Sequence, residues 1–219
     1  MKKRRRKNAI SSFVVFLLLL GTFFAIISLS NMQNHTPLVK KDPFTDVKKY
    51  RTTIYNELAK NHLENYTTVL VALMQQESHG RGGDPMQASE SAGLPRNSIK
   101  DPNQSIQLGV KQFQRVLTYG QQKNVDFATI IQAYNMGKGY IDYIAEHGGK
   151  HNEELAKSFS LIQVQKAPNL YTCGGNKNNF RYPYCYGDFT YSSKVSKNIQ
   201  LLTVSQQVAD NKKTTEQSF

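Results

Sequence analysis

One uncharged segment near the N-terminus constrains this chain more than any other feature of its sequence. No Asp, Glu, Lys or Arg occurs from Asn8 to Val39, and the stretch from Phe13 to Leu29 is almost wholly apolar. About 20 such residues cross the hydrocarbon core of a bilayer. Six basic residues at positions 2–7 precede it and favour a cytoplasmic N-terminus. We therefore expect residues 1–8 to be cytoplasmic and residues 9–30 to form a single transmembrane signal-anchor.

A cleaved signal peptide is the alternative, because Ser28-Leu29-Ser30 resembles a cleavage site. The apolar run is longer than the roughly 7–15 residues of a usual signal-peptide core, which favours the anchor. Both readings place the remaining chain outside the cell membrane, either anchored to it or secreted.

The remaining chain divides into three parts. Residues 31–44 contain Pro37 and Pro43 among polar residues and predict a short linker. Residues 45–208 have the length of one ordinary domain. The polar residues 209–219 predict a flexible tail.

The way in which the net charge of +12 is distributed along the chain argues against a nucleic-acid partner. Half of it lies in the basic run at positions 2–7, where membrane topology explains it. The rest of the chain keeps 22 of the 28 basic residues against 16 acidic ones, and they are scattered rather than clustered. This moderate excess either favours an anionic polymer such as a bacterial wall or is a solvated basic surface.

The two cysteines, Cys173 and Cys185, have no histidine near them, so no zinc site is expected. We expect no metal and no cofactor elsewhere in the chain. Outside the cell, a disulfide between them is favoured over two unpaired thiols, and it would contribute about 3 kcal/mol in the chain-entropy model.

Apolar residues recur at helical spacing through most of the domain, and no segment shows a convincing strand pattern. Asp101 and Asp126 are suited to cap helices that follow them. We therefore predict an all-α fold with an irregular stretch at 170–191. The predicted helices are 46–62, 66–76, 101–120, 127–136, 140–146, 152–164 and 192–208.

Glu77 follows the most apolar of these helices, at its C-terminal end. The negative end of the helix dipole disfavours a carboxylate there, and apolar surroundings limit its hydration. Both effects raise the pKa of the carboxyl group. Cleavage of a glycosidic bond requires an acid that is still protonated at working pH. The alternative is an ordinary solvated glutamate at a helix end.

Three blocks in order carry a resemblance to a known family. They are Glu77-Ser78, residues 84–91 (DPMQASES) and Ala133-Tyr134-Asn135, the last followed by Gly137 and Gly139. They resemble the motifs of the lysozyme-like superfamily of goose-type lysozymes and soluble lytic transglycosylases. Within it, the chain is most similar to the lysozyme domain of CwlT-type wall hydrolases, over about residues 45–205.

The resemblance implies a lysozyme-like helical domain that acts on peptidoglycan, with Glu77 as general acid. Tyr134 would hydrogen-bond Glu77, and Gln87 and Asn135 would hold the N-acetyl groups and hydroxyls of the sugars. Ser78 would line the site near the reacting sugar. Without the resemblance, Tyr134 reads as a core residue, Asn135 as a helix cap and Gln87 as a turn residue.

The group that attacks the sugar stays open at this point. A lytic transglycosylase uses a hydroxyl of its own substrate, whereas a hydrolase places a water, often with a second carboxylate. Asp84 is the leading candidate for that carboxylate, followed by Glu90, which we also place among the substrate-binding residues. Each could instead be a turn or loop residue, and Asp101 is better explained as a cap.

CwlT-type domains are regarded as muramidases, so the resemblance favours hydrolysis of the bond between N-acetylmuramic acid and N-acetylglucosamine. The cysteine peptidase domain that normally follows is missing from this sequence, which limits the expectation to glycan cleavage. The alternative is a non-catalytic peptidoglycan-binding or assembly component of an envelope or conjugation machine.

Overall fold

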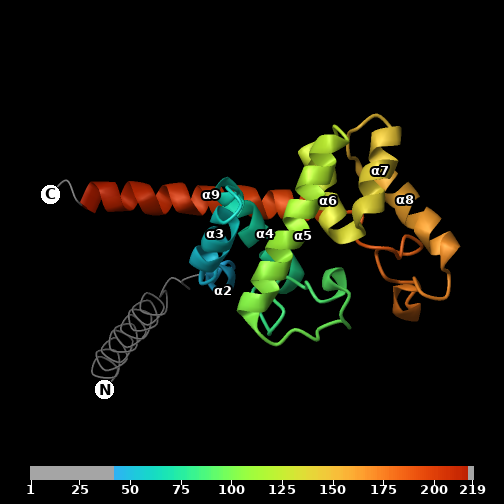
Figure 1. Ribbon diagram of the computed structural model, residues 1–219, viewed down its shortest axis with the longest axis horizontal. Helices are drawn as coiled ribbons and strands as arrows, with labels where there is room; N and C mark the ends of the chain where they lie inside the picture. The colour runs from blue at the N-terminus through green and yellow to red at the C-terminus, as the bar shows by residue number, and fades with distance from the viewer. Residues whose placement is uncertain (1–41, 217–219) are drawn as a thin grey trace, which may run out of the picture. The chain divides into compact units, whose positions relative to one another are not determined.

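Between residues 42 and 216, the part of the chain that the computed structural model describes, every regular element is a helix (Figure 1). This confirms the all-α expectation. The α-helices are α2 (Thr45–Lys48), α3 (Arg51–Ala59), α4 (Thr67–Ser78), α5 (Pro102–Gln122), α6 (Phe127–Met136), α7 (Lys138–Glu146), α8 (Glu153–Lys166) and α9 (Tyr191–Glu216). Three 3-10 turns are η1 (Glu64–Tyr66), η2 (Glu90–Ala92) and η3 (Cys173–Gly175).

The expected membrane anchor at 9–30 lies outside the described residues, as do the cytoplasmic segment and most of the linker. From residue 42 to residue 216, no helix combines the length and the apolar character needed to cross a bilayer.

Short polar side chains begin three of the helices. The Oδ1 atom of Asp101 accepts a hydrogen bond from Asn103 N at 2.9 Å, and that of Asp126 accepts one from Thr129 N at 2.9 Å. Asn152 caps α8 in the same way through Leu155 N at 2.8 Å. Each cap satisfies a backbone donor that the first helical turn leaves without a partner, so these helix starts were readable from the sequence.

Two of the predicted helices differ from the observed ones by more than about two residues at an end. The segment 46–62 divides into α2 and α3, because the chain tightens where Tyr50 N donates to Val47 O at 3.0 Å. The break lets Val47 from α2 and Ile54 from α3 both become fully buried. At the other end, α9 continues to Glu216 rather than ending at residue 208, since no Gly or Pro interrupts it.

Helix α4 is the centre of the core. Its residues Leu70, Val71, Ala72, Leu73 and Met74 are all fully buried. It packs against α9 on one side and α3 on another, while α5 packs against α3, α6 and α7. Glu77 follows this buried run by less than one turn, so its carboxyl is held at the edge of the core.

Gly109 allows the loop between α4 and α5 to lie directly on α5. A Cβ atom at this position would meet Met86 Cβ at 2.7 Å and Met86 Cγ at 2.8 Å. Met86 is itself buried, and its neighbour Gln87 belongs to one of the three motif blocks. The small residue on α5 therefore sets the depth at which this block sits.

We predict that Gly109→Ala destabilises the protein by about 1–3 kcal/mol. The added methyl group would clash with the Cβ and Cγ atoms of Met86, which lie next to the backbone and cannot easily move away. Gly139→Ala is the matched control in α7, where the added Cβ would lie at an ordinary 3.6 Å from Phe159. Alanine at that control site should be neutral or stabilising by up to about 1 kcal/mol. Urea denaturation of both variants measures the difference, and equal stabilities would contradict this account of Gly109.

Candidate active site

A pocket of about 350 Å³ lies at the C-terminal end of α4 and brings together most of the predicted site residues. From the prediction it contains Glu77, Gln87, Glu90, Tyr134 and Asn135. Ser78 and Asp84 are not among its lining residues. Two other lining residues, Ser91 and Gly137, belong to the motif blocks or follow them directly. The remaining lining residues, which the sequence did not single out, are Arg96, Gln112 and Tyr186.

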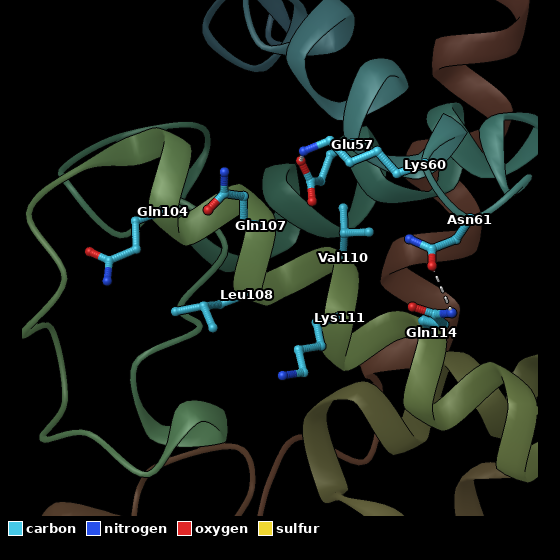
Figure 2. A pocket seen from close by; sticks show the side chains of 9 residues that line it. All are labelled: Glu57, Lys60, Asn61, Gln104, Gln107, Leu108, Val110, Lys111 and Gln114. Atoms are coloured by element: carbon cyan, nitrogen blue, oxygen red, sulfur yellow. Dashed lines mark hydrogen bonds and ion pairs between the residues drawn. The ribbon is translucent and has the colours of Figure 1, made fainter.

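A larger hollow of about 600 Å³ lies elsewhere, between α3 and α5 (Figure 2). Its wall is mostly amide and lysine side chains, with Asn61 and Gln114 bonded across it at 3.2 Å. Its carboxylate, Glu57, is paired with Lys60. The smaller pocket therefore offers the stronger acid–base chemistry.

Glu77 is a carboxyl group of the pocket whose acidity is strongly altered. Burial at the core edge raises the pKa of Glu77 from its ordinary 4.5 to about 7. A hydrogen bond from Tyr191 opposes this rise, the negative charge of Asp84 adds to it, and Arg96 and Glu90 have smaller effects of opposite sign. A large fraction of Glu77 is consequently protonated at neutral pH.

The hydrogen-bond partner of Glu77 is Tyr191, which corrects the expectation for Tyr134. The hydroxyl of Tyr191 donates to Glu77 Oε1 at 2.5 Å, whereas that of Tyr134 donates to Met86 O at 3.4 Å. Burial, and then the charges of Glu77 and Asp84, raise the pKa of Tyr134 well above its ordinary value. Tyr134 therefore lines the pocket as an uncharged phenol, and its hydrogen bond also holds the loop at Met86.

Asp84 is an internal anchor of the loop rather than a free carboxylate, contrary to its expected place beside the substrate. Each of its oxygens accepts two hydrogen bonds. Oδ1 accepts from Ala88 N at 2.8 Å and Ser105 Oγ at 2.7 Å, and Oδ2 accepts from Ser89 N at 3.0 Å and Ser89 Oγ at 2.5 Å. Burial alone would raise the pKa of Asp84, but these hydrogen bonds outweigh it and lower the pKa below its ordinary value. Asp84 thus stays ionised and has no acceptor position left for a water.

Ser78 also serves the backbone instead of the pocket. Its Oγ donates to Pro85 O at 2.7 Å and accepts from Gly80 N at 3.0 Å and Arg81 N at 3.2 Å. These bonds close the end of α4 and fasten it to the following loop. The expectation that Ser78 lines the site is therefore not met in this structure.

The two amide residues of the motifs are both oriented by the backbone. Gln87 adopts a left-handed conformation with φ of 48°, and its Nε2 donates to Asp84 O at 3.1 Å. Asn135, in the last turn of α6, accepts a hydrogen bond from Asp188 N through Oδ1 at 2.7 Å. Both side chains line the pocket in positions that these hydrogen bonds fix.

The irregular segment before α9 completes the pocket with Tyr186. Ser160 Oγ donates to Tyr186 O at 2.8 Å, and the Tyr186 hydroxyl donates to Met136 O at 2.9 Å. The preceding residue, Cys185, forms a disulfide with Cys173, with their Cα atoms 5.0 Å apart. No motif pointed to Tyr186 or to Tyr191, because their roles depend on contacts with helices far away in the sequence.

The pocket supplies two carboxyl groups, Glu77 and Glu90, and one guanidinium, Arg96. Within residues 42–216, no three His, Cys, Asp or Glu side chains gather in a group that could hold a metal ion. The arrangement suits proton transfer by a buried acid, with amides to bind a polar substrate.

We predict that Glu77→Gln stabilises the protein at alkaline pH. The raised pKa means that the folded state loses stability as pH rises from about 4.5 through about 7, since the buried carboxyl must then ionise. The variant should exceed the parent by up to about 3 kcal/mol at pH 8 and by little at pH 4. Denaturant unfolding across this range measures it, with Glu146→Gln, at the exposed end of α7, as the matched control. A gain that is the same at every pH would contradict the assignment.

Comparisons with known proteins identify the family to which the chain is similar. The family profile for lysozyme-like proteins matches residues 44–199. The "Uncharacterized membrane protein YocA" of Bacillus subtilis is 47% identical over 219 residues, which is 95% of this chain and 95% of YocA. The "Bifunctional muramidase/DL-endopeptidase CwlT" of the same species is 40% identical over 121 residues, but these are 55% of this chain and only 36% of CwlT.

A solved structure shows the same fold. It is a Staphylococcus aureus protein described as similar to a lipoprotein of the NLP/P60 family, with a TM-score of 0.60 and 36% identity. The match covers 70% of this chain and 52% of that chain. The profile match over residues 44–199 and the helical architecture show that the chain belongs to the lysozyme-like family.

Proposed function

We propose that this protein is a peptidoglycan glycosidase that cleaves the bond between N-acetylmuramic acid and N-acetylglucosamine. The observation that carries the proposal is Glu77, a carboxyl with a pKa of about 7 in a pocket lined by Gln87, Gln112 and Asn135. Such an acid can be protonated in a neutral environment and can still give up its proton. Amide side chains in the same pocket suit the N-acetyl and hydroxyl groups of the glycan.

In this proposal Glu77 protonates the glycosidic oxygen as the bond from that oxygen to the anomeric carbon breaks. Tyr191 holds Oε1, so the proton that is transferred sits on Oε2. The ionised Asp84, fixed in the loop, raises the pKa of Glu77 and opposes its early ionisation. The role for Tyr191 replaces the one that the sequence suggested for Tyr134.

Hydrolysis is favoured over lytic transglycosylation, and Glu90 becomes the leading second carboxylate. Glu90 lines the pocket, whereas both oxygens of Asp84 are occupied by hydrogen bonds. A water placed by Glu90 would add to the anomeric carbon and transfer a proton to the Glu90 carboxylate, as in inverting glycosidases. The similar protein CwlT is named a muramidase, which points in the same direction.

We further propose that residues 9–30 anchor the protein in the cell membrane and that the domain at 45–208 acts on the wall outside. Two observations support this. The relative YocA is named a membrane protein, and the Cys173–Cys185 disulfide is typical of oxidising, extracytoplasmic compartments. Peptidoglycan strands are then the partner of the pocket.

The first test compares the parent chain with Glu77→Gln in a zymogram of purified wall. The parent should clear the wall, and the variant should lose at least about 100-fold in rate because the general acid is removed. Mass spectrometry of the products then identifies the reaction, since reducing muramic ends mean hydrolysis and anhydro-muramic ends mean transglycosylation. Wall binding without any released fragment would instead support a non-catalytic envelope or conjugation component.

The second test is Tyr191→Phe, which removes the hydrogen bond to Glu77 and keeps the ring. That bond lowers the pKa of Glu77, so its loss should raise the pKa and move the alkaline limb of the activity profile to higher pH. Activity at the optimum should also fall, because the acid is no longer held in one orientation. Tyr134→Phe is the matched control, and a limb that moves with Tyr134 instead would overturn the role given to Tyr191.

A further inference from the structure

Arg96 is the one cationic side chain among the described residues that line the pocket of Glu77. It lies in the loop between η2 and α5, next to Asn97, whose φ of 56° turns the chain. Its side chain is exposed, and from residue 42 to residue 216 the structure records no hydrogen bond or ion pair for the guanidinium. A cation with no structural partner at a substrate pocket is available for a ligand.

The position of Arg96 is electrostatically coupled to the reacting group. Its charge acts on Glu77 more strongly than that of Glu90, which lines the same pocket. Arg115, which contacts two lining residues of the pocket, is already engaged, since its Nη2 donates to Gln112 Oε1 at 2.6 Å and to Ser91 O at 3.2 Å. Arg115 therefore holds the wall of the pocket together, and Arg96 is left to face what enters it.

We propose that Arg96 is a specificity residue that binds a carboxylate of the glycan beside the scissile bond. This inference rests on the proposed function, because it takes a glycan as the occupant of the pocket. Gln87, Gln112 and Asn135 are neutral and suit groups that both wall sugars share. A guanidinium adds recognition of an acidic group through two parallel N–H donors, which a neutral sugar does not satisfy.

Two parts of a wall strand carry a carboxylate near a glycosidic bond. One is the lactyl group of a muramyl residue without a peptide, and the other is the peptide stem of a substituted one. The shared chemistry is a carboxylate within reach of Arg96. A preference for one source would make the enzyme selective for bare or for substituted strands.

The hollow between α3 and α5 contains lysine side chains that would compete with Arg96 for a carboxylate ligand. Figure 2 shows Lys60 and Lys111 at its wall, and Lys60 is already paired with Glu57. Lys111→Gln therefore removes the same charge as Arg96→Gln, but in a pocket without the predicted acid. This makes it the matched control.

The experiment measures binding by calorimetry to the full-length chain in detergent, in the Glu77→Gln background so that no ligand is cut. The ligands are chitotetraose, a peptide-free tetrasaccharide of alternating N-acetylglucosamine and N-acetylmuramic acid, the same tetrasaccharide with its carboxyls amidated, and a peptide-bearing form. At least one carboxylate ligand should bind about 10-fold more tightly than chitotetraose and the amidated form. Arg96→Gln should abolish this difference and leave the affinity for chitotetraose unchanged, which also shows that the variant is folded.

Two results would overturn the inference. One is an equal loss of affinity for neutral and acidic ligands in Arg96→Gln, and the other is a loss of carboxylate preference in Lys111→Gln instead. Wall clearance by the parent chain is read separately. Carboxylate binding through Arg96 without clearance removes the proposed enzymatic function alone, whereas clearance without carboxylate preference removes this inference alone.

Discussion

The burial of α4 against α9 is the constraint on which the rest of the site depends. It removes water from the end of α4, where Glu77 lies, and burial is the largest cause of the raised pKa of that carboxyl. The same packing brings Tyr191, the first residue of α9, into hydrogen-bonding distance of Glu77. A helix pair that stabilises the core therefore also sets the acidity and the orientation of the proposed acid.

A second carboxylate, Asp84, has the opposite environment and a different role. Four hydrogen bonds keep it ionised and tie the loop at residues 84–89 to Ser105 of α5. Its fixed negative charge makes ionisation of Glu77 harder. Two carboxyl groups near one site thus have pKa values displaced in opposite directions, because one is desolvated and the other is saturated with donors.

The relatives place these features in a family without deciding the reaction. The CwlT name includes muramidase activity, but this chain aligns with only 36% of that protein, and YocA carries no activity in its name. The case for hydrolysis therefore depends on Glu77 and on Glu90 as the carboxyl that faces the pocket. The proposed role of Arg96 would add recognition of an acidic group to this pocket.

The helical class, the capped starts at Asp101 and Asp126, and the place of Glu77 at the end of a buried helix could be predicted from the sequence, because they depend on local periodicity and on neighbouring residues. The sequence also brought forward Gln87, Glu90, Tyr134 and Asn135, which meet in one pocket. The hydrogen bond of Glu77 to Tyr191 rather than Tyr134, and the roles of Asp84 and Ser78 in holding the loop, could not be predicted in this way. Hydrogen-bond partners are set by distance in space, and Tyr191 is 114 residues from Glu77 along the chain.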